Sequence, residues 1–219
     1  GRPPGVLLES VEGGETLGRW SVIACDPLWT ASARGDRLTR QWRNGASDVH
    51  QGNPFDGLRQ HLMPYRCANL PGLPPLGQLY GMWGYELIQW IEPTVAIHPQ
   101  DDSSPPDGIW MLMDGILIFD QVKRLITAVA YGDLSGGCSV ETAWQSALAR
   151  IADLRRRMDA PLPAVAPLQW SPNADVLPDV SSNRDRSDFE AAVDSAREHI
   201  AAGDVFQLVL SQRLEASVP

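Results

Sequence analysis

Cysteine is scarce in this chain of 219 residues, and its three cysteines, Cys25, Cys67 and Cys138, lie far apart. An odd number of cysteines without any C-x-x-C spacing argues against both a disulfide framework and a zinc site. Thiols that are neither paired nor metal-bound are typical of a reducing compartment. We therefore predict a cytoplasmic protein.

Long apolar runs and clusters of basic residues are also missing. No run approaches the roughly 20 apolar residues that cross a bilayer. Asp and Glu number 27 against 18 Lys and Arg, which gives a net charge of -9, and the basic residues are scattered along the chain. Scattered basic residues do not form the positive surface that nucleic acids or anionic membranes require. We predict neither of these partners.

Familiar catalytic motifs are absent as well. The four histidines lie in different segments without a second ligand at metal spacing, at His50, His61, His98 and His199. The glycine-rich stretch GMWGYE lacks the lysine of a phosphate-binding loop, and no G-x-S-x-G motif surrounds Ser211. On motifs alone we assign no catalytic residue and no metal ligand to this chain.

The sequence does contain clear secondary-structure patterns. Short apolar runs separated by glycine-containing turns between Val6 and Trp42 predict an antiparallel meander. Asn53 and Pro54 favour the start of a helix that continues to Leu62. Two strands joined by a turn at 120–123, a helix over 139–158 and a helix over 187–202 follow in the expected order.

Each of the last two helices carries finer signals. For the helix over 139–158 we predict a buried face formed by Val140, Trp144, Leu148, Ile151 and Leu154, with the arginines opposite. Ser187 and Glu190 have the spacing of a capping box, and Gly203 suits the left-handed residue that ends a helix. After Gly203 the alternating segment 205–214 predicts a strand.

Proline marks the domain organisation. Five prolines between Ala160 and Val180, with few apolar repeats, indicate a linker. We divide the chain into an N-terminal domain of regulatory type over 1–160, a Pro-rich linker over 161–186, and the truncated start of a catalytic domain over 187–219.

Five segments occur in an order that resembles one enzyme family. They are VLLESVEGG, GRWSVIACDP, GMWGYELIQWIEP, GILIFDQVKRLITAVA and GDVFQLVLSQR. This series, from about Gly5 to Ala216, is similar to the N-terminal half of component I of anthranilate synthase and of aminodeoxychorismate synthase. The resemblance implies an α+β fold in which antiparallel sheets pack orthogonally with helices outside, in a protein about twice this length.

The resemblance also implies a reaction and its partners. The family adds ammonia, supplied by a glutamine amidotransferase subunit, to chorismate, with Mg²⁺ holding the substrate carboxylate. Anthranilate synthases then eliminate pyruvate in tryptophan biosynthesis, whereas aminodeoxychorismate synthases serve the folate pathway. The family's catalytic residues and magnesium ligands lie in its C-terminal half. We therefore expect this chain to bind no cofactor and to be inactive alone.

A regulatory site is implied by the segment that contains Glu9 and Ser10. In anthranilate synthases the matching segment lines a pocket for tryptophan as a feedback inhibitor. A carboxylate such as Glu9 can pair with an ammonium group, and Ser10 can hydrogen-bond the polar end of the ligand. Arg19 and Trp20 are candidates from the next strand. By periodicity alone, the same segment is an ordinary strand.

Three residues near the end of the chain have two possible interpretations. Gly203, Asp204 and Gln207 border the catalytic half in the family, and they are either part of the active-site floor or a helix end followed by a buried strand.

Four aromatic residues are predicted to lie in the core, namely Trp83, Tyr85, Trp90 and Trp110. The arginines at 155–157 are predicted to form a solvated face. An amino-acid-binding domain without catalysis is the alternative of a different class.

Overall fold

The computed structural model describes residues 4–9, 18–67, 69–74, 77–95, 105–161 and 180–216. They belong to two compact units, Gly1–Leu162 and Pro163–Pro219, which are described separately. None of the helices in these ranges is both long and apolar enough to cross a membrane.

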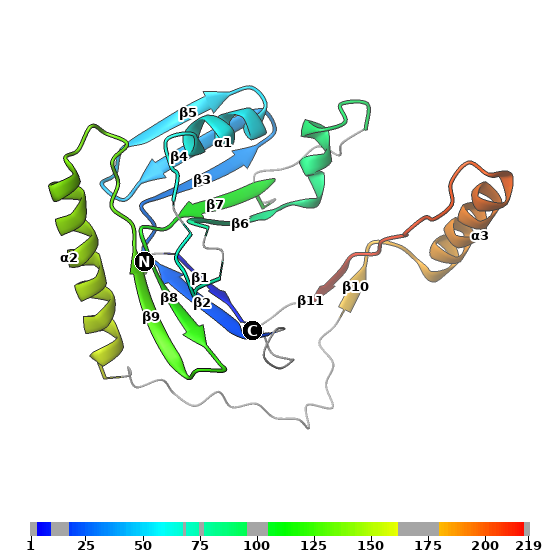
Figure 1. Cartoon of the computed structure of the whole chain (residues 1–219). Helices are drawn as coiled ribbons and strands as arrows, with labels where there is room; N and C mark the ends of the chain where they lie inside the picture. The colour runs from blue at the N-terminus through cyan, green and yellow to red at the C-terminus, as the bar shows by residue number, and fades with distance from the viewer. Residues whose placement is uncertain are drawn as a thin grey trace. The chain divides into compact units, whose positions relative to one another are not determined.

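The first unit contains two antiparallel sheets with helices beside them (Figure 1). The four-stranded sheet has the order β1 (Gly5–Leu8), β2 (Trp20–Cys25), β8 (Gly115–Asp120), β9 (Leu125–Ala130). The five-stranded sheet has the order β5 (Ser47–Gln51), β4 (Arg37–Trp42), β3 (Trp29–Arg34), β7 (Gly108–Leu112), β6 (Leu79–Trp83). The helices are α1 (Pro54–Leu62), the 3-10 helix η1 (Tyr85–Trp90) and α2 (Val140–Asp159). The expected α+β class with antiparallel sheets is confirmed.

The predicted single meander over Val6 to Trp42 is wrong, because the chain changes sheet within it. β2 pairs with β1 and β8, whereas β3 pairs with β4 and β7. The chain changes sheet a second time after β7. The segment that was predicted to be one hairpin, with its turn at 120–123, therefore forms three strands, β7, β8 and β9. The two crossing points are adjacent, since the Leu28 N–H donates to the Leu112 carbonyl at 2.7 Å. Asp26, with φ of 61°, makes the first bend.

The helices α1 and α2 begin where the sequence predicts, and a side chain caps the start of each. The Asn53 side chain accepts a hydrogen bond from the Phe55 N–H at 2.9 Å at the start of α1. The Ser139 hydroxyl accepts one from the Thr142 N–H at 3.1 Å at the start of α2. These side chains satisfy donors that the first turn of a helix leaves without partners.

The buried face of α2 agrees with the prediction at Leu154 and differs from it at three of the other predicted positions. Ala143, Ala147, Arg150 and Leu154 are buried, while Val140, Trp144 and Leu148 are exposed. The helix lies against β8 and β9 (Figure 1). It approaches closely because two glycines lie beneath it: a Cβ on Gly115 would be 2.8 Å from the Arg150 side chain, and one on Gly132 would be 2.9 Å from the Ala143 carbonyl. Ala143 lies over Gly132, and the larger side chains of Arg150 and Leu154 occupy the space that Gly115 leaves free.

Each sheet contributes one buried cluster to the core. In the five-stranded sheet the largest members are Trp29 and Trp110, and in the four-stranded sheet they are Met113, Ile116 and Ile118. The prediction that the aromatic residues are core is therefore confirmed for Trp110. It is wrong for Tyr85, which is 94% exposed.

The second unit consists of β10 (Val180–Ser182), α3 (Arg186–Ala202) and β11 (Leu214–Ala216), with β10 and β11 antiparallel. Gly203 ends α3 with φ of 82°, as predicted. The capping box is wrong, because Asp185 occupies the N-cap and Ser187 lies inside the helix. Of the segment 205–214, which was predicted to be a strand, only Leu214 lies in one, namely β11, and Phe206 is 95% exposed.

That strand does not form because its alternating side chains require sheet neighbours, and the described residues provide none along 205–213. β10 lies within the segment predicted to be a linker. The division into a regulatory domain, a linker and a catalytic domain stays a prediction.

Candidate functional site

The residues of the predicted tryptophan site lie at one end of the four-stranded sheet. Glu9 directly follows β1 and is exposed, and Arg19 and Trp20 stand at the start of β2. The pairing of Leu8 with Val22 places these two chain ends at the same end of the sheet. Ser10 lies outside the described residues. The role of these residues in tryptophan binding stays a prediction.

Arg19 is bound to the neighbouring strand. Its guanidinium donates two hydrogen bonds to the Asp120 carboxylate, at 3.0 and 2.6 Å, and its centre lies 4.4 Å from the Trp20 ring. The same carboxylate accepts the backbone N–H groups of Val122 and Lys123 at 3.1 and 3.0 Å. The hydrogen bonds from Arg19, followed by those from Lys123 and Val122, lower the pKa of Asp120 from 3.8 to about 2, against the effect of burial. This pair therefore joins β2 to the turn between β8 and β9.

The Asp120→Asn substitution should remove a pH-dependent part of the stability. A carboxyl group whose pKa is lowered by folding stabilises the folded protein above its ordinary pKa of 3.8, and this contribution is lost as the pH falls toward about 2. Urea unfolding of the wild-type chain should therefore show a decline over that range, and the variant a shallower one. The exposed Asp159 provides a matched Asp→Asn control. Equal slopes in wild type and Asp120→Asn would contradict the assignment.

The candidate residues of the second unit surround the end of α3. The Asp204 carboxylate lies 2.8 Å from Nδ1 of His199, and Gly203 donates its N–H back to the last turn. Gln207 is exposed. The backbone N–H of Asp204 donates to the His199 carbonyl at 3.0 Å and so satisfies a carbonyl of the last turn. The participation of Gly203, Asp204 and Gln207 in an active site stays a prediction.

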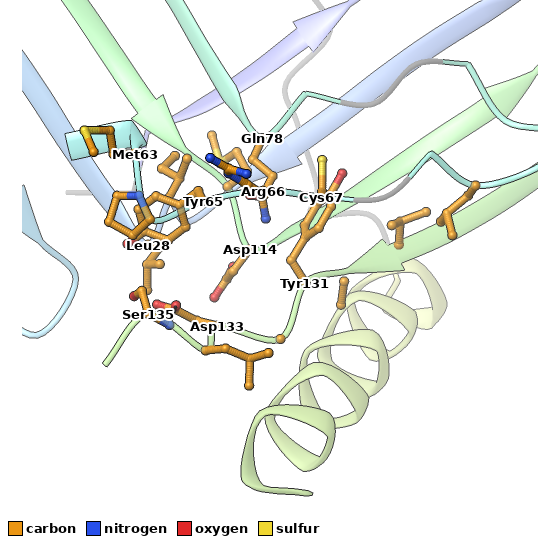
Figure 2. Close-up of a pocket in the computed structure, with 18 residues that line it drawn as sticks. Leu28, Met63, Tyr65, Arg66, Cys67, Gln78, Asp114, Tyr131, Asp133 and Ser135 are labelled. Carbon is orange, nitrogen blue, oxygen red and sulfur yellow. Dashed lines mark hydrogen bonds between the residues drawn. The ribbon is translucent and has the colours of Figure 1, made fainter. Parts of the chain in front are cut away.

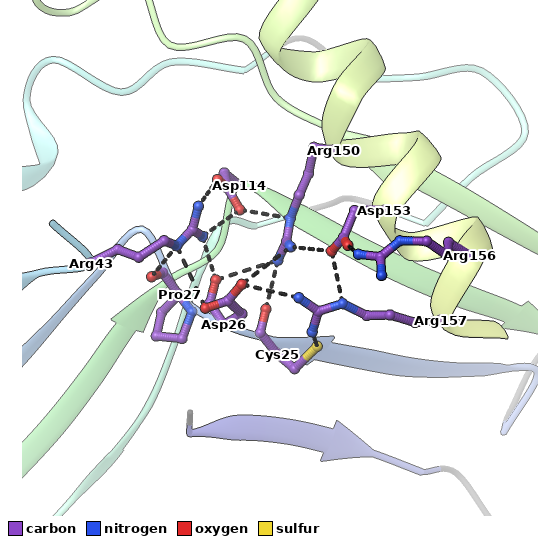
Figure 3. Close-up of polar contacts among 9 residues, drawn as sticks. All are labelled: Cys25, Asp26, Pro27, Arg43, Asp114, Arg150, Asp153, Arg156 and Arg157. Carbon is purple, nitrogen blue, oxygen red and sulfur yellow. Dashed lines mark hydrogen bonds and ion pairs between the residues drawn. The ribbon is translucent and has the colours of Figure 1, made fainter. Parts of the chain in front are cut away.

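A cluster of opposite charges that the sequence reasoning missed lies where α2 meets the links between the sheets (Figure 3). Its members are Asp26, Asp114 and Asp153 with Arg43, Arg150, Arg156 and Arg157. Asp26 follows β2 and Asp114 separates β7 from β8, so both carboxylates lie at the points where the chain changes sheet. We call this group the arginine–aspartate network.

Arg150 is the centre of the network. Its side chain is only 9% exposed and lies 3.0 Å from Asp114, 3.2 Å from Asp153 and 3.5 Å from Asp26. It also donates to the Cys25 carbonyl at 2.7 Å. A buried guanidinium is tolerated only when such partners replace its water.

Contacts within the network also shift the pKa values of two outer members, Arg43 and Asp153. The hydrogen bond to Asp114 raises the pKa of Arg43, against the effect of burial. For Asp153, burial acts to raise the pKa, but the hydrogen bond from Arg156 and the charges of Arg157, Arg156 and Arg150 lower it overall. The arginines at 155–157 were predicted to form a solvated face. This prediction is correct for Arg155, which is 83% exposed, whereas Arg157 forms ion pairs with Asp26 and Asp153.

One signal in the sequence points to the buried position of Arg150. Ala143, Ala147, Arg150 and Leu154 follow one another at spacings of four, three and four, the repeat of a single helix face. Of its aspartate partners, Asp153 lies three residues further along the same helix, whereas Asp26 and Asp114 carry no such signal, because they lie between strands far away in the sequence.

A cavity of about 480 Å³ lies beside the second crossing point (Figure 2). Its walls come from the segment after α1, from the end of β7 and from the residues around Tyr131 that follow β9. Two backbone hydrogen bonds of 2.9 Å hold these walls together, from Tyr131 N–H to the Asp114 carbonyl and from Met113 N–H to the Gln78 carbonyl. The Tyr131 hydroxyl is buried and has no hydrogen-bond partner within the described part of the chain.

The described residues contain no group of three or more His, Cys, Asp or Glu side chains arranged to hold a metal ion.

Comparisons with known proteins agree on one family. The profile of the chorismate binding enzymes matches residues 6–219. The chain is 47% identical over 219 residues to anthranilate synthase component 1 of Synechocystis sp., covering 97% of this chain and 43% of that relative. It is 34% identical over 212 residues to anthranilate synthase component 1 of Acetivibrio thermocellus, covering 95% of this chain and 42% of that relative.

A solved structure shows the same relationship. The crystal structure of anthranilate synthase component I from Streptococcus pneumoniae TIGR4 superposes with a TM-score of 0.66 at 27% sequence identity, over 98% of this chain and 44% of that one. The chain thus spans less than half the length of the relatives it matches.

Proposed function

We propose, since this chain belongs to the chorismate binding enzyme family, that it is the N-terminal part of an anthranilate synthase component I. The observation that carries this proposal is the match to the Synechocystis relative, 47% identical along 97% of the chain. The whole protein would convert chorismate and ammonia to anthranilate and pyruvate, with ammonia supplied by a glutamine amidotransferase subunit in the cytoplasm.

The relatives named above favour this assignment over aminodeoxychorismate synthase, because each is named anthranilate synthase component 1 or I. In the proposed division of labour, the residues described here form the scaffold and one wall of a regulatory site. The reacting groups and the magnesium ligands would come from the half of the relatives that this chain does not cover.

The regulatory part of the proposal concerns Glu9 and its surroundings. The carboxylate of Glu9 is exposed at the end of β1, where it is available to an ammonium group. Trp20 lies at the same end of the sheet and partly packs on the apolar cluster of Ile116 and Ile118. This arrangement supports tryptophan as the ligand, and an amino-acid-binding domain without catalysis would use the same residues.

One preparation of the 219-residue chain tests both parts. Supplied with chorismate, ammonium and Mg²⁺, it should form no fluorescent anthranilate and release no pyruvate, whereas a full-length relative assayed beside it should form both. Turnover by the chain alone would contradict the proposal that the reacting groups lie elsewhere. Calorimetric titration with tryptophan should give saturable heat that Glu9→Gln weakens. An absence of heat at millimolar tryptophan would remove the regulatory assignment from this chain.

A further inference from the structure

The cavity beside the second crossing point, between β7 and β8, is lined by both apolar and polar side chains. Its apolar and aromatic side chains include Leu28, Leu112, Val129 and Tyr65, and its polar side chains include Arg66, Gln78 and Asp133. Its volume of about 480 Å³ falls within the range of small-molecule sites, roughly 300–1,000 Å³, which are mostly apolar with a few placed polar groups.

Its most unusual group is the hydroxyl of Tyr131. A buried hydroxyl without a hydrogen-bond partner costs free energy, and here no partner exists within the described residues. Burial, followed by the nearby Tyr80 and Cys67, raises the pKa of Tyr131, so the phenol keeps its proton. The group is therefore a buried donor without an acceptor among the described residues, on a side chain that lines the cavity.

One cation and two carboxylates line the cavity. Arg66 lines it and is exposed, and Figure 2 shows its guanidinium near Gln78. The carboxylate of Asp114 is held between Arg43 and Arg150 at 2.8–3.0 Å, which neutralises it. The remaining carboxylate, Asp133, accepts the Ser135 N–H at 2.8 Å.

Three charged side chains line the cavity itself, Arg66, Asp114 and Asp133. Because Asp114 is ion-paired with both Arg43 and Arg150, a carboxylate that entered the cavity would meet the Arg66 guanidinium, the Tyr131 hydroxyl and one further carboxylate, Asp133, which accepts the Ser135 N–H.

We propose that this cavity binds a small carboxylate with an apolar or aromatic body, whose oxygens accept hydrogen bonds from the Tyr131 hydroxyl and from the Arg66 guanidinium. The apolar body lies against Leu28, Leu112 and Val129. The two contacts are charge-assisted, which makes them stronger than neutral hydrogen bonds.

This site is separate from the one predicted around Glu9. Asp114 and Tyr131 lie at the end of the four-stranded sheet where Gly115 pairs with Ala130. Trp20 and Asp120 pair at the opposite end of β8. The proposal does not depend on the proposed enzymatic function, and a failure of either leaves the other unaffected.

Benzoate is a suitable probe, with benzamide as its uncharged analogue and benzylamine as its cationic one. In a titration of the whole chain followed by NMR, millimolar benzoate should shift the backbone amide signals of Arg66 and Tyr131 in a saturable way and leave Leu8 unmoved. Benzamide and benzylamine should bind more weakly. Absence of saturable shifts with benzoate, or equal or tighter binding of either analogue, would overturn the proposal.

Two substitutions test the named contacts. Tyr131→Phe and Arg66→Gln should each weaken benzoate binding about tenfold, the loss expected for one hydrogen bond to a charged group. Tyr85→Phe is the matched control, because Tyr85 is 94% exposed outside the cavity. Tyr131→Phe should not lower the thermal unfolding midpoint, since the hydroxyl has no bonded partner to lose within the described residues. Unchanged affinity in both variants, or a lower midpoint for Tyr131→Phe, would contradict the assignment.

Discussion

Replacing Arg150 by methionine is expected to lower the free energy of unfolding of the first unit by about 3–5 kcal/mol, the usual cost of removing one partner from a buried ionic group. The side chain is 9% exposed and contacts Asp26, Asp114 and Asp153 (Figure 3). Methionine fills most of the same space but leaves these carboxylates with fewer counter-charges in a partly buried position. Urea unfolding followed by tryptophan fluorescence measures the loss.

Arg155→Met is the matched control on the same helix. Arg155 is 83% exposed, and its contact with Asp159 at 3.9 Å is a surface pair, for which the expected change is about 0–1 kcal/mol. Similar losses in the two variants would show that the contacts of Arg150 contribute no more than a surface ion pair does. The role of the network in joining α2 to both sheet crossings would then be wrong.

Trp110→Ala should have an effect of similar size, because it removes one of the two tryptophan side chains that are buried in the interior of the five-stranded sheet. Trp110 is 2% exposed, and its ring lies 4.8 Å from that of Trp83. Glycines give it room on both sides: a Cβ on Gly81 or Gly108 would lie 2.5 or 2.4 Å from the indole. Truncation leaves a cavity that these neighbours cannot fill, at a cost of about 3–5 kcal/mol.

The control for this prediction is Trp144→Ala, on the exposed face of α2, where Trp144 is 59% exposed. A surface substitution of this kind changes the stability by about 0.5 kcal/mol or less. Both variants are compared by the midpoint of urea unfolding at a common slope. A midpoint for Trp110→Ala that matches the control would contradict the assignment of Trp110 to the core.

The difference between Trp110 and Trp144 shows where sequence reasoning reached its limit. Both are large apolar residues in regular elements, and both were predicted to be buried. The helix periodicity identifies a set of residues that share a face, but two overlapping sets exist in α2: one contains Trp144, and the other contains Arg150 and Leu154. The second is buried because Gly115 and Gly132 bring the sheet close to the helix, and that approach depends on residues of other elements.

For the function and the candidate sites, too, one part was predictable from the sequence and another part was not. The order of five segments was sufficient to identify the family, and the matches to its members confirm it. The cavity around Tyr131 was not predictable, because its walls come from segments near residues 65, 78, 113 and 131 that the fold brings together. No spacing along the chain relates these segments.

By itself, the sequence determined the family and the helix ends at Asn53, Ser139 and Gly203. These ends depend on hydrogen bonds and backbone angles within a few residues, so the local sequence contains the information. The tertiary structure alone decided which strands share a sheet, that Arg150 is buried and that the Tyr131 hydroxyl meets no acceptor in the described chain. The physical reason is that pairing partners, counter-charges and cavity walls come from distant segments, and only their packing determines which of several equivalent local patterns is buried.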